Sequence, residues 1–226
     1  VDGVVVAEHY NAFTPFEAVL KGLTPGVHKL SVLVDNSFSE ASALHVENDY
    51  QSYGGISRGV MLEQLPKHYI KQLHFTPVCK DDTWYAQLEL VIASLDGKPW
   101  KGNVSVSLKG CNDVNENVLY TQSCSTGAGE LVLKSDLIAC ENAKPWAPEH
   151  PTLYQVTARL QDESGCVIDD LIDRVGFREV RTQGKDILLN GKKLQIKGFC
   201  RHEDHPQFGC ALPLSAIMQD LQLARD

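Results

Sequence analysis

The stretch TWYAQLELVIA, residues 83–93, is followed after a turn by NVSVSLKG, residues 103–110, and these two runs decide the fold of most of the chain. In the second run every other residue from Val104 to Leu108 is apolar, which is typical of a strand with one face in a core. The remaining runs of this kind are YIKQLHF (69–75), NVLYTQS (117–123), GELVLKS (129–135), TLYQVTARL (152–160) and CVIDDLIDRVGF (166–177). About seven short strands over roughly 110 residues, from 67 to 178, predict an immunoglobulin-like β-sandwich.

Further β structure is expected before the sandwich. Asp2-Gly3 is a strong hairpin-turn dipeptide, and VVVAEH (4–9) follows it as the second strand of a hairpin. HKLSVLVDN (28–36) has alternating apolar residues and predicts another half-buried strand. Only Val1 precedes the turn, so the natural chain is expected to begin earlier.

The C-terminal segment changes from a strand pattern to a helical one. DILLNGKKLQIKG (186–198) predicts a hairpin around Asn190-Gly191. The residues with helical spacing are Leu214, Ile217, Met218 and Leu221. Pro213 opens this helix, Ser215 is its candidate cap, and no stop signal precedes Asp226. A strand, a polar loop and a helix form the first βα step of a barrel or a wound sheet, so both ends of the chain are expected to be cut from a longer protein.

Composition and charge exclude several classes of protein. The 226 residues are 43% hydrophobic and 22% charged, as in a soluble globular protein, and the net charge of −8 argues against a nucleic-acid partner. No apolar run is long enough to span a membrane, so no membrane partner is predicted. The seven cysteines are odd in number and never spaced as Cys-x-x-Cys, which predicts reduced thiols and a cytoplasmic protein.

The sequence GFCRHEDHPQFG (198–209) places two histidines and two carboxylates close together. A zinc-protease motif needs histidines four residues apart on a helix, whereas these are three apart after a strand-like run, so no metal is predicted. In an extended chain His202 and Asp204 share one face, and Arg201 and Glu203 share the other. The pattern leaves open a local ion pair of Arg201 or a strand end that faces a substrate pocket.

The stretch ILLNGKKLQIKGFCRHEDHPQFG (187–209) resembles the start of the catalytic barrel in glycoside hydrolase family 2. That family contains β-glucuronidases and β-galactosidases. Three further stretches agree in order and spacing: NAFTPFEA (11–18), YGGISRGVMLEQLP (53–66) and KPWAPEHPTLYQV (144–156). The resemblance therefore extends over nearly the whole sequence.

The resemblance implies a mainly β chain in three parts. Residues 1–66 would be the C-terminal part of a jelly-roll domain, 67–178 the immunoglobulin-like sandwich, and 179–226 the first βα unit of a truncated (β/α)8 barrel. Family members are similar to retaining glycosidases, which use two carboxyl groups and no cofactor. Both catalytic glutamates are expected beyond Asp226, so no catalytic residue is predicted within the chain, and the parent protein is expected to be a homo-oligomer.

Four residues are candidates for substrate binding through the resemblance. Asp49 matches a jelly-roll aspartate that reaches sugar hydroxyls in the glucuronidases, although Tyr50 and Gln51 replace two phenylalanines of that motif. His202 matches a histidine that lines the sugar pocket, and Glu203 and Asp204 lie beside it. For Trp146, core packing is favoured over sugar stacking.

The expected substrate is a carbohydrate. YGGISRGVMLEQLP (53–66) is more similar to the glucuronidase form of its motif and favours terminal β-D-glucuronides. RHEDHP (201–206) leans toward the galactosidases, so a β-galactosidase is the alternative. A non-catalytic β-sandwich that binds glycans or another protein remains the second class of function.

Overall fold

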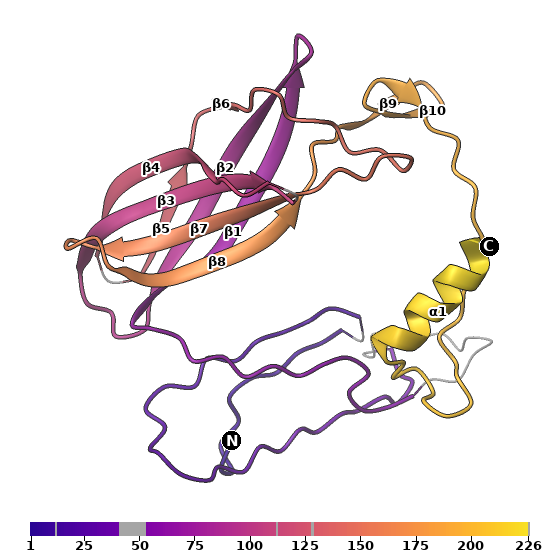
Figure 1. Cartoon of the computed structure of the whole chain (residues 1–226). Helices are drawn as coiled ribbons and strands as arrows, with labels where there is room; N and C mark the ends of the chain where they lie inside the picture. Colours follow the sequence, from indigo (N-terminus) through magenta and orange to yellow (C-terminus); the bar gives the residue numbers. More distant parts are fainter. Residues whose placement is uncertain (12, 41–52, 112, 128, 226) are drawn as a thin grey trace. The chain divides into compact units, whose positions relative to one another are not determined.

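The computed structural model describes residues 1–11, 13–40, 53–111, 113–127 and 129–225 (Figure 1). The chain divides into two compact units. One consists of Val1–Leu62 together with Gly198–Asp226, and the other of Glu63–Lys197. Among the described residues, the strands lie in the second unit and the helix lies in the first.

The unit formed by residues 63–197 contains an antiparallel β-sandwich (Figure 1). One sheet has the order β4-β3-β7-β8, and the other has the order β1-β2-β5 with β6 paired to β2. The strands are β1 His68–Lys80, β2 Thr83–Ser94, β3 Trp100–Gly110, β4 Asn117–Thr126, β5 Glu130–Lys134, β6 Ile138–Ala139, β7 Tyr154–Asp162 and β8 Val167–Val175. Each of the seven sequence runs coincides with one of these strands, which confirms the predicted sandwich.

The core lies between the two sheets, because alternate side chains of each strand point to the same side. The central strands β2, β3 and β7 contribute Leu88, Leu90, Ile92, Val104, Val106, Val156, Ala158 and Leu160, all of them fully buried. Phe177, after β8, is also fully buried, and the rings of Phe75, Trp84 and Tyr154 meet it edge-on at centroid distances of 5.5, 5.8 and 5.2 Å. These aromatic contacts add to the apolar area that the sandwich buries.

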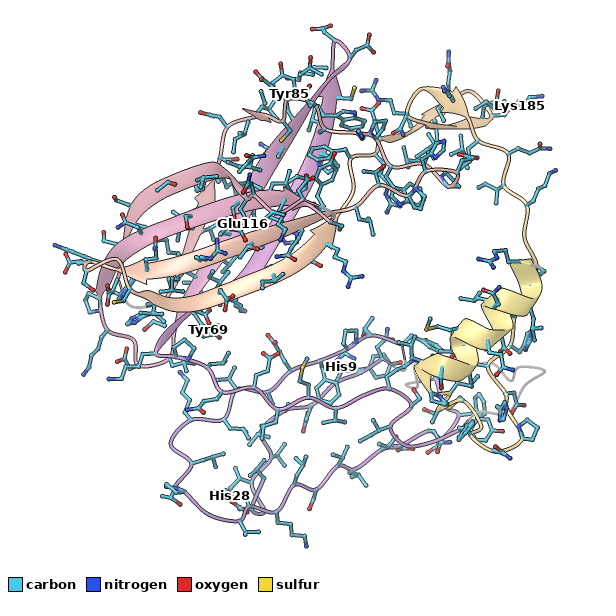
Figure 2. The ribbon with its side chains drawn as sticks, in the orientation of Figure 1. His9, His28, Tyr69, Tyr85, Glu116 and Lys185 are labelled. Atoms are coloured by element: carbon cyan, nitrogen blue, oxygen red, sulfur yellow. The ribbon has the colours of Figure 1, made fainter. Side chains whose placement is uncertain are left out.

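A polar network lies on the β4-β3-β7 side of the sandwich, where Figure 2 labels Glu116. Arg159 of β7 donates to the two Glu116 carboxylate oxygens at 2.9 and 3.1 Å. The Ser107 hydroxyl of β3 donates to the same carboxylate at 2.9 Å. The Arg159 hydrogen bonds, followed by that from Ser107, lower the pKa of Glu116 below its ordinary value.

A small sheet of order β11-β10-β9 follows the sandwich and consists of β9 Val180–Gln183, β10 Asp186–Leu189 and β11 Lys192–Lys193. Asn190 and Gly191 have φ angles of 50° and 74°, as a type I′ hairpin turn requires. The Asn190 side chain accepts a hydrogen bond from Glu179 N at 2.9 Å and donates one to Trp146 O at 3.0 Å. The predicted hairpin is therefore confirmed, although its second arm is short.

Trp146 packs within the same unit. The Arg178 guanidinium lies over its ring at 5.1 Å from the centroid, and Gly176 leaves room for the ring. A side chain at Gly176 would come within 3.2 Å of Trp146. These contacts agree with a packing role for Trp146.

The predicted strands at 4–9 and 28–36 are wrong, because no strand forms among the described residues of 1–62. The turn itself is present: Asp2 and Gly3 have φ angles of 51° and 83°, and Val4 N donates to Val1 O at 2.9 Å. The two segments meet at the turn, where Asp2 N donates to Lys29 O at 2.9 Å. A strand needs a ladder of such bonds along its length, and the alternating side chains of 28–36 stay largely exposed.

The helix α1, Leu214–Arg225, confirms the predicted helical segment. Its first carbonyl acceptor is Pro213 O, which receives hydrogen bonds from Ala216 N at 3.0 Å and Ile217 N at 3.3 Å. Pro213 is therefore the residue at the cap position, and Ser215, which was the candidate, lies inside the first turn. Within the described part of the chain, no helix has both the length and the apolar character to cross a bilayer.

Candidate functional site

The candidate site lies in the unit of residues 1–62 and 198–226, where segment 53–59 contacts the loop before α1. The loop starts with Arg201-His202-Glu203-Asp204, for which no helix or strand is assigned. Arg201 Nη1 donates to Glu203 Oε1 at 3.3 Å. This contact confirms that Arg201 and Glu203 share one side of the chain, as expected for residues two apart in an extended segment.

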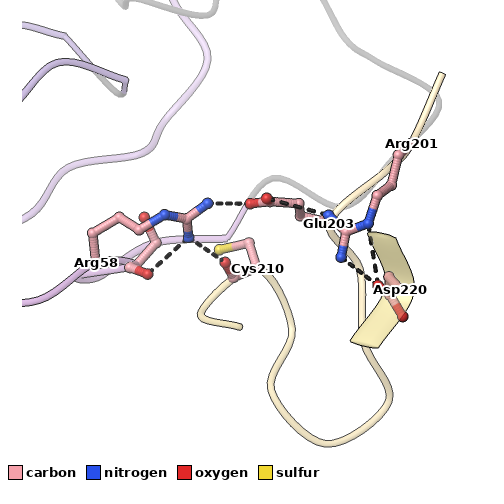
Figure 3. Close-up of polar contacts among 6 residues, drawn as sticks. Arg58, Arg201, Glu203, Cys210 and Asp220 are labelled. Carbon is pink, nitrogen blue, oxygen red and sulfur yellow. Dashed lines mark hydrogen bonds and ion pairs between the residues drawn. The ribbon is translucent and has the colours of Figure 1, made fainter. Parts of the chain in front are cut away.

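Glu203 lies between two guanidinium groups (Figure 3). Oε2 of its carboxylate pairs with Arg58 Nη2, and Oε1 pairs with Arg201. Arg201 also donates from Nε and Nη2 to Asp220 Oδ2 of α1, at 3.1 and 2.5 Å. The hydrogen bond to Asp220 is the main reason why the pKa of Arg201 is raised above its ordinary value.

Arg58 connects the two ends of the loop. In addition to its ion pair with Glu203, its Nη1 donates to the carbonyl oxygen of Cys210 at 3.0 Å and to that of Ser57 at 3.0 Å (Figure 3). Glu203 and Cys210 are seven residues apart, so one guanidinium group holds both ends of the intervening segment. The planar donor fork of arginine is suited to such divergent acceptors.

Tyr53 holds the next carboxylate of the loop. Its hydroxyl donates to Asp204 Oδ1 at 2.6 Å, and this bond is the main cause of the raised pKa of Tyr53. Its ring also lies against Gly209, where an added Cβ would come within 3.1 Å of Tyr53 Cε1. Gly209 has a φ angle of 54°, so both its conformation and this contact favour glycine.

His205 closes a tight turn within the loop. Its backbone N donates to Gly209 O at 3.0 Å, and Gly209 N donates back to His205 O at 2.8 Å. The His205 ring stacks on Phe208 at 4.9 Å, and its Nδ1 accepts a hydrogen bond from Gln207 N at 3.1 Å. His205 therefore shapes the loop, and no cluster of three potential metal ligands occurs among the residues that the structure describes.

A groove of about 460 Å³ adjoins Arg58. It is lined by Ile56, Ser57, Arg58, Gly59, Ala211, Leu212, Pro213, Leu214 and Ile217. Most of this lining is apolar, and Arg58 is its charged member.

The structure brings together only part of the predicted substrate-binding set. Glu203 and Asp204 are both bonded to segment 53–58, and His202 is exposed between Arg201 and Glu203 in the chain. Asp49 lies outside the described residues. The sequence did not identify Tyr53, Arg58 or Asp220 as members of the site. Tyr53 and Arg58 lie in YGGISRGVMLEQLP (53–66), a stretch that resembles a family motif and was the available signal.

Comparison with known proteins places this arrangement in a family. The sequence model for "Glycosyl hydrolases family 2" matches residues 68–178, and the model for the "TIM barrel domain" of that family matches residues 180–226. The chain belongs to glycosyl hydrolases family 2. Its fold is accordingly a mainly β chain with a sandwich, followed by the start of a TIM barrel domain.

Relatives in the family act on different sugars. A crystal structure of a GH2 β-galacturonidase from Eisenbergiella tayi bound to galacturonate is 52% identical, with a TM-score of 0.89, over 99% of this chain and 39% of that chain. A putative β-glucuronidase from Formosa agariphila is 28% identical over 100% of this chain and 27% of its own length. A β-galactosidase from Pseudoalteromonas haloplanktis is 29% identical over 90% of this chain and 20% of its own length. The chain thus spans well under half the length of these family 2 relatives.

Proposed function

We propose that the complete protein to which this chain belongs is a retaining β-uronidase that releases terminal β-D-galacturonate. The observation that carries this proposal is the 52% identity over 99% of the chain to the β-galacturonidase of Eisenbergiella tayi. The glucuronidase and galactosidase relatives are 28% and 29% identical. The proposal therefore prefers galacturonide to the glucuronide that the sequence motifs favoured.

The proposed reaction needs two carboxyl groups about 5 to 5.5 Å apart, one as nucleophile and one as acid and base. The family resemblance assigns both to barrel segments beyond Asp226. The residues of this chain would instead bind and orient the sugar. Asp49 and Asp204 can accept hydrogen bonds from sugar hydroxyls, and such bonds to a charged group are stronger than those between neutral groups.

The charge of Asp49 constrains how a uronate could bind. A carboxylate at this position would repel the carboxylate on C5 of the sugar ring, so the acid group of the substrate would point away from it. A hydroxyl edge would face Asp49 instead. Galacturonate and glucuronate differ only in the configuration at C4, so a contact with this hydroxyl would distinguish the two sugars.

A terminal β-D-glucuronide is the second candidate substrate. It is supported by the putative β-glucuronidase of Formosa agariphila, which matches the chain from end to end. A β-galactoside has the same C4 configuration as the galacturonide but lacks the carboxylate. These three sugars therefore separate the effect of the acid group from the effect of C4.

The test is to measure kcat/KM of the purified complete protein on the 4-nitrophenyl β-D-glycosides of galacturonate, glucuronate and galactose. We expect the galacturonide to be the best substrate, by about a hundredfold or more over the galactoside, because a site built for a carboxylate rejects an analogue without one. Retention of the β configuration in the first-formed product would support the retaining mechanism. Preference for the galactoside would contradict the proposal, and preference for the glucuronide would support the second candidate.

A further inference from the structure

The acceptor capacity of Glu203 is already in use. Each oxygen of its carboxylate faces a different guanidinium group, that of Arg58 or that of Arg201, and Arg201 is further balanced by Asp220. The four charges of this network sum to zero. Glu203 is therefore poorly placed to accept a hydrogen bond from a sugar hydroxyl or to attract a cationic ligand.

Arg58 and Tyr53 hold two consecutive carboxylates from one short segment of chain. Arg58 binds Glu203, and Tyr53 binds Asp204 at 2.6 Å. Successive side chains of an extended segment point to opposite sides. Because Glu203 and Asp204 are held on opposite sides of the extended segment, the segment cannot rotate about its own axis. Its rotation determines where the neighbouring side chains point.

Arg58 also restrains both ends of the loop 203–210. Its hydrogen bond to Cys210 O, at 3.0 Å, and its ion pair with Glu203 bring the two ends of 203–210 to one guanidinium group. The turn between His205 and Gly209 closes the middle of the same loop. Fixing the ends of a loop removes conformations that the chain would otherwise have to lose when a ligand binds.

We propose that Arg58 is a positioning residue for the sugar-binding loop: together with Tyr53 it orders residues 203–210 and directs His202 and Asp204 toward the substrate, while Glu203 serves as its anchor and not as a sugar ligand. This inference rests on the proposed function of the site for its connection to a sugar. The ordering of the loop by Arg58 can be measured independently of any substrate.

The ion pairs of the network are partly exposed, and this makes the proposal testable. The Arg58 side chain is 55% exposed and that of Glu203 is 33% exposed. Exposed ion pairs contribute little to global stability. Loss of Arg58 should therefore leave the melting temperature nearly unchanged while it loosens the loop, whereas a residue with a merely structural role would change both or neither.

The experiment compares the complete protein with its Arg58→Ala, Arg58→Lys and Glu203→Gln variants. Arg181→Ala is the matched control, because Arg181 forms an exposed ion pair with Glu179 at 2.6 Å in the other unit. Hydrogen exchange of residues 203–210, including the bonded amides of His205 and Gly209, is measured by mass spectrometry, and the melting temperature of each variant is measured by thermal unfolding. The best glycoside of the substrate panel then gives KM and kcat separately.

In Arg58→Ala we expect exchange in 203–210 to be about fivefold faster or more, and KM to rise by at least about fivefold with a smaller change in kcat. Arg58→Lys should recover part of both effects, since it keeps the charge but cannot hold Glu203 and Cys210 O together. Combining Arg58→Ala with Glu203→Gln should add little to either change. Arg181→Ala should leave the loop and KM unchanged.

Unchanged exchange in 203–210 for Arg58→Ala would overturn the proposal, and so would an unchanged KM in an active enzyme. If Arg58→Ala does not fold, Arg58→Lys and Glu203→Gln decide the same question. A wild-type protein that hydrolyses none of the three glycosides would refute the proposed function alone, because the exchange comparison still decides whether Arg58 orders the loop.

Discussion

The Tyr53 hydroxyl donates a hydrogen bond of 2.6 Å to Asp204 Oδ1, and so joins residues 151 positions apart in the sequence. The ion pair of Arg58 with Glu203 joins residues 145 positions apart. Both contacts lie in the same compact unit, which is formed from the two ends of the chain. The candidate site is therefore a product of folding between distant segments, and neither segment contains it alone.

Removing the Tyr53 hydroxyl should weaken substrate binding. Tyr53→Phe keeps the ring that packs on Gly209 and removes only the hydrogen bond to Asp204. We expect kcat/KM of the complete enzyme to fall by about twofold to tenfold, because the lost hydrogen bond is exposed to water and contributes about 0.5 to 1.5 kcal/mol. Tyr10→Phe is the control, since Tyr10 is 66% exposed and lies in the same unit. Equal activities for wild type and Tyr53→Phe would show that the bond does not position Asp204.

The sequence predicted the sandwich because its signals are local and repeat many times. The alternation from Val104 to Leu108 identified β3 and the side that it buries. The hairpin at Asn190-Gly191 was likewise evident from two residues whose positive φ angles the turn requires. The strands expected at 4–9 and 28–36 do not form in the described residues. Alternation of apolar residues indicates which side chains share one side of a strand, but a strand also needs a hydrogen-bonded partner along its length.

The candidate site was predictable only in part. Alternation in the extended segment predicted that Arg201 and Glu203 share a side, and their 3.3 Å contact agrees with it. The residues around Arg58 in the sequence do not indicate that it pairs with a carboxylate 145 positions away. The salt-bridging role of Asp220 was also hidden, because an exposed carboxylate on a helix has no periodicity that distinguishes it from its neighbours.

Gly102 should be sensitive to the smallest enlargement of its side chain. It lies in β3 between Cys124 of β4 and Asp162 of β7, and an added Cβ would be 2.1 Å from Gln161 O and 2.3 Å from Trp100 Cζ2. Gly102→Ala should destabilise the chain by about 1 to 3 kcal/mol, as overpacking does in other cores. Thermal and urea unfolding of the purified chain measure this cost.

Gly127→Ala is the matched control for that measurement. Among the described residues, leaving out Gly127 itself and its chain neighbours, no atom lies within 4 Å of a Cβ added at Gly127, and its φ is outside the left-handed region. The control should change stability by less than about 0.5 kcal/mol. A loss of similar size in both variants would show that the close approach at Gly102 is not the cause.

The ion pair of Glu116 with Arg159 should make stability depend on acid pH. The folded-state pKa of Glu116 is lowered, chiefly by the Arg159 hydrogen bonds. The ionised form is therefore favoured in the folded state, and the stabilisation is fully present above the unfolded pKa of about 4.3. It is lost as the pH falls through the lower, folded value.

Glu116→Gln should remove this contribution. At neutral pH we expect it to lower the free energy of unfolding by about 0.5 to 1 kcal/mol, a value reduced for solvent screening of a pair that is about one-third exposed. The difference from wild type should shrink below about pH 4.3. Glu163→Gln, at an exposed turn position of the same unit, is the control. A difference that stays constant into acid would exclude the ion pair as its source.

Asp49 offers the sharpest test of the substrate-binding residues that came from the family resemblance. If its carboxylate accepts hydrogen bonds from the sugar hydroxyls, Asp49→Ala should reduce kcat/KM of the complete enzyme by about tenfold to a few hundredfold, which corresponds to a total loss of about 1.5 to 3 kcal/mol of binding to a charged acceptor. Asp49→Asn keeps the acceptor oxygen and should lose less. Glu40→Ala removes an exposed carboxylate from the same unit and should have no effect.

If Asp49 contacts the C4 hydroxyl, its loss should also bring the ratio of galacturonide to glucuronide activity closer to one. Unchanged kcat/KM on both uronides and on the galactoside would mean that Asp49 does not bind the sugar. The role of the matching aspartate in the glucuronidases would then not apply to Asp49.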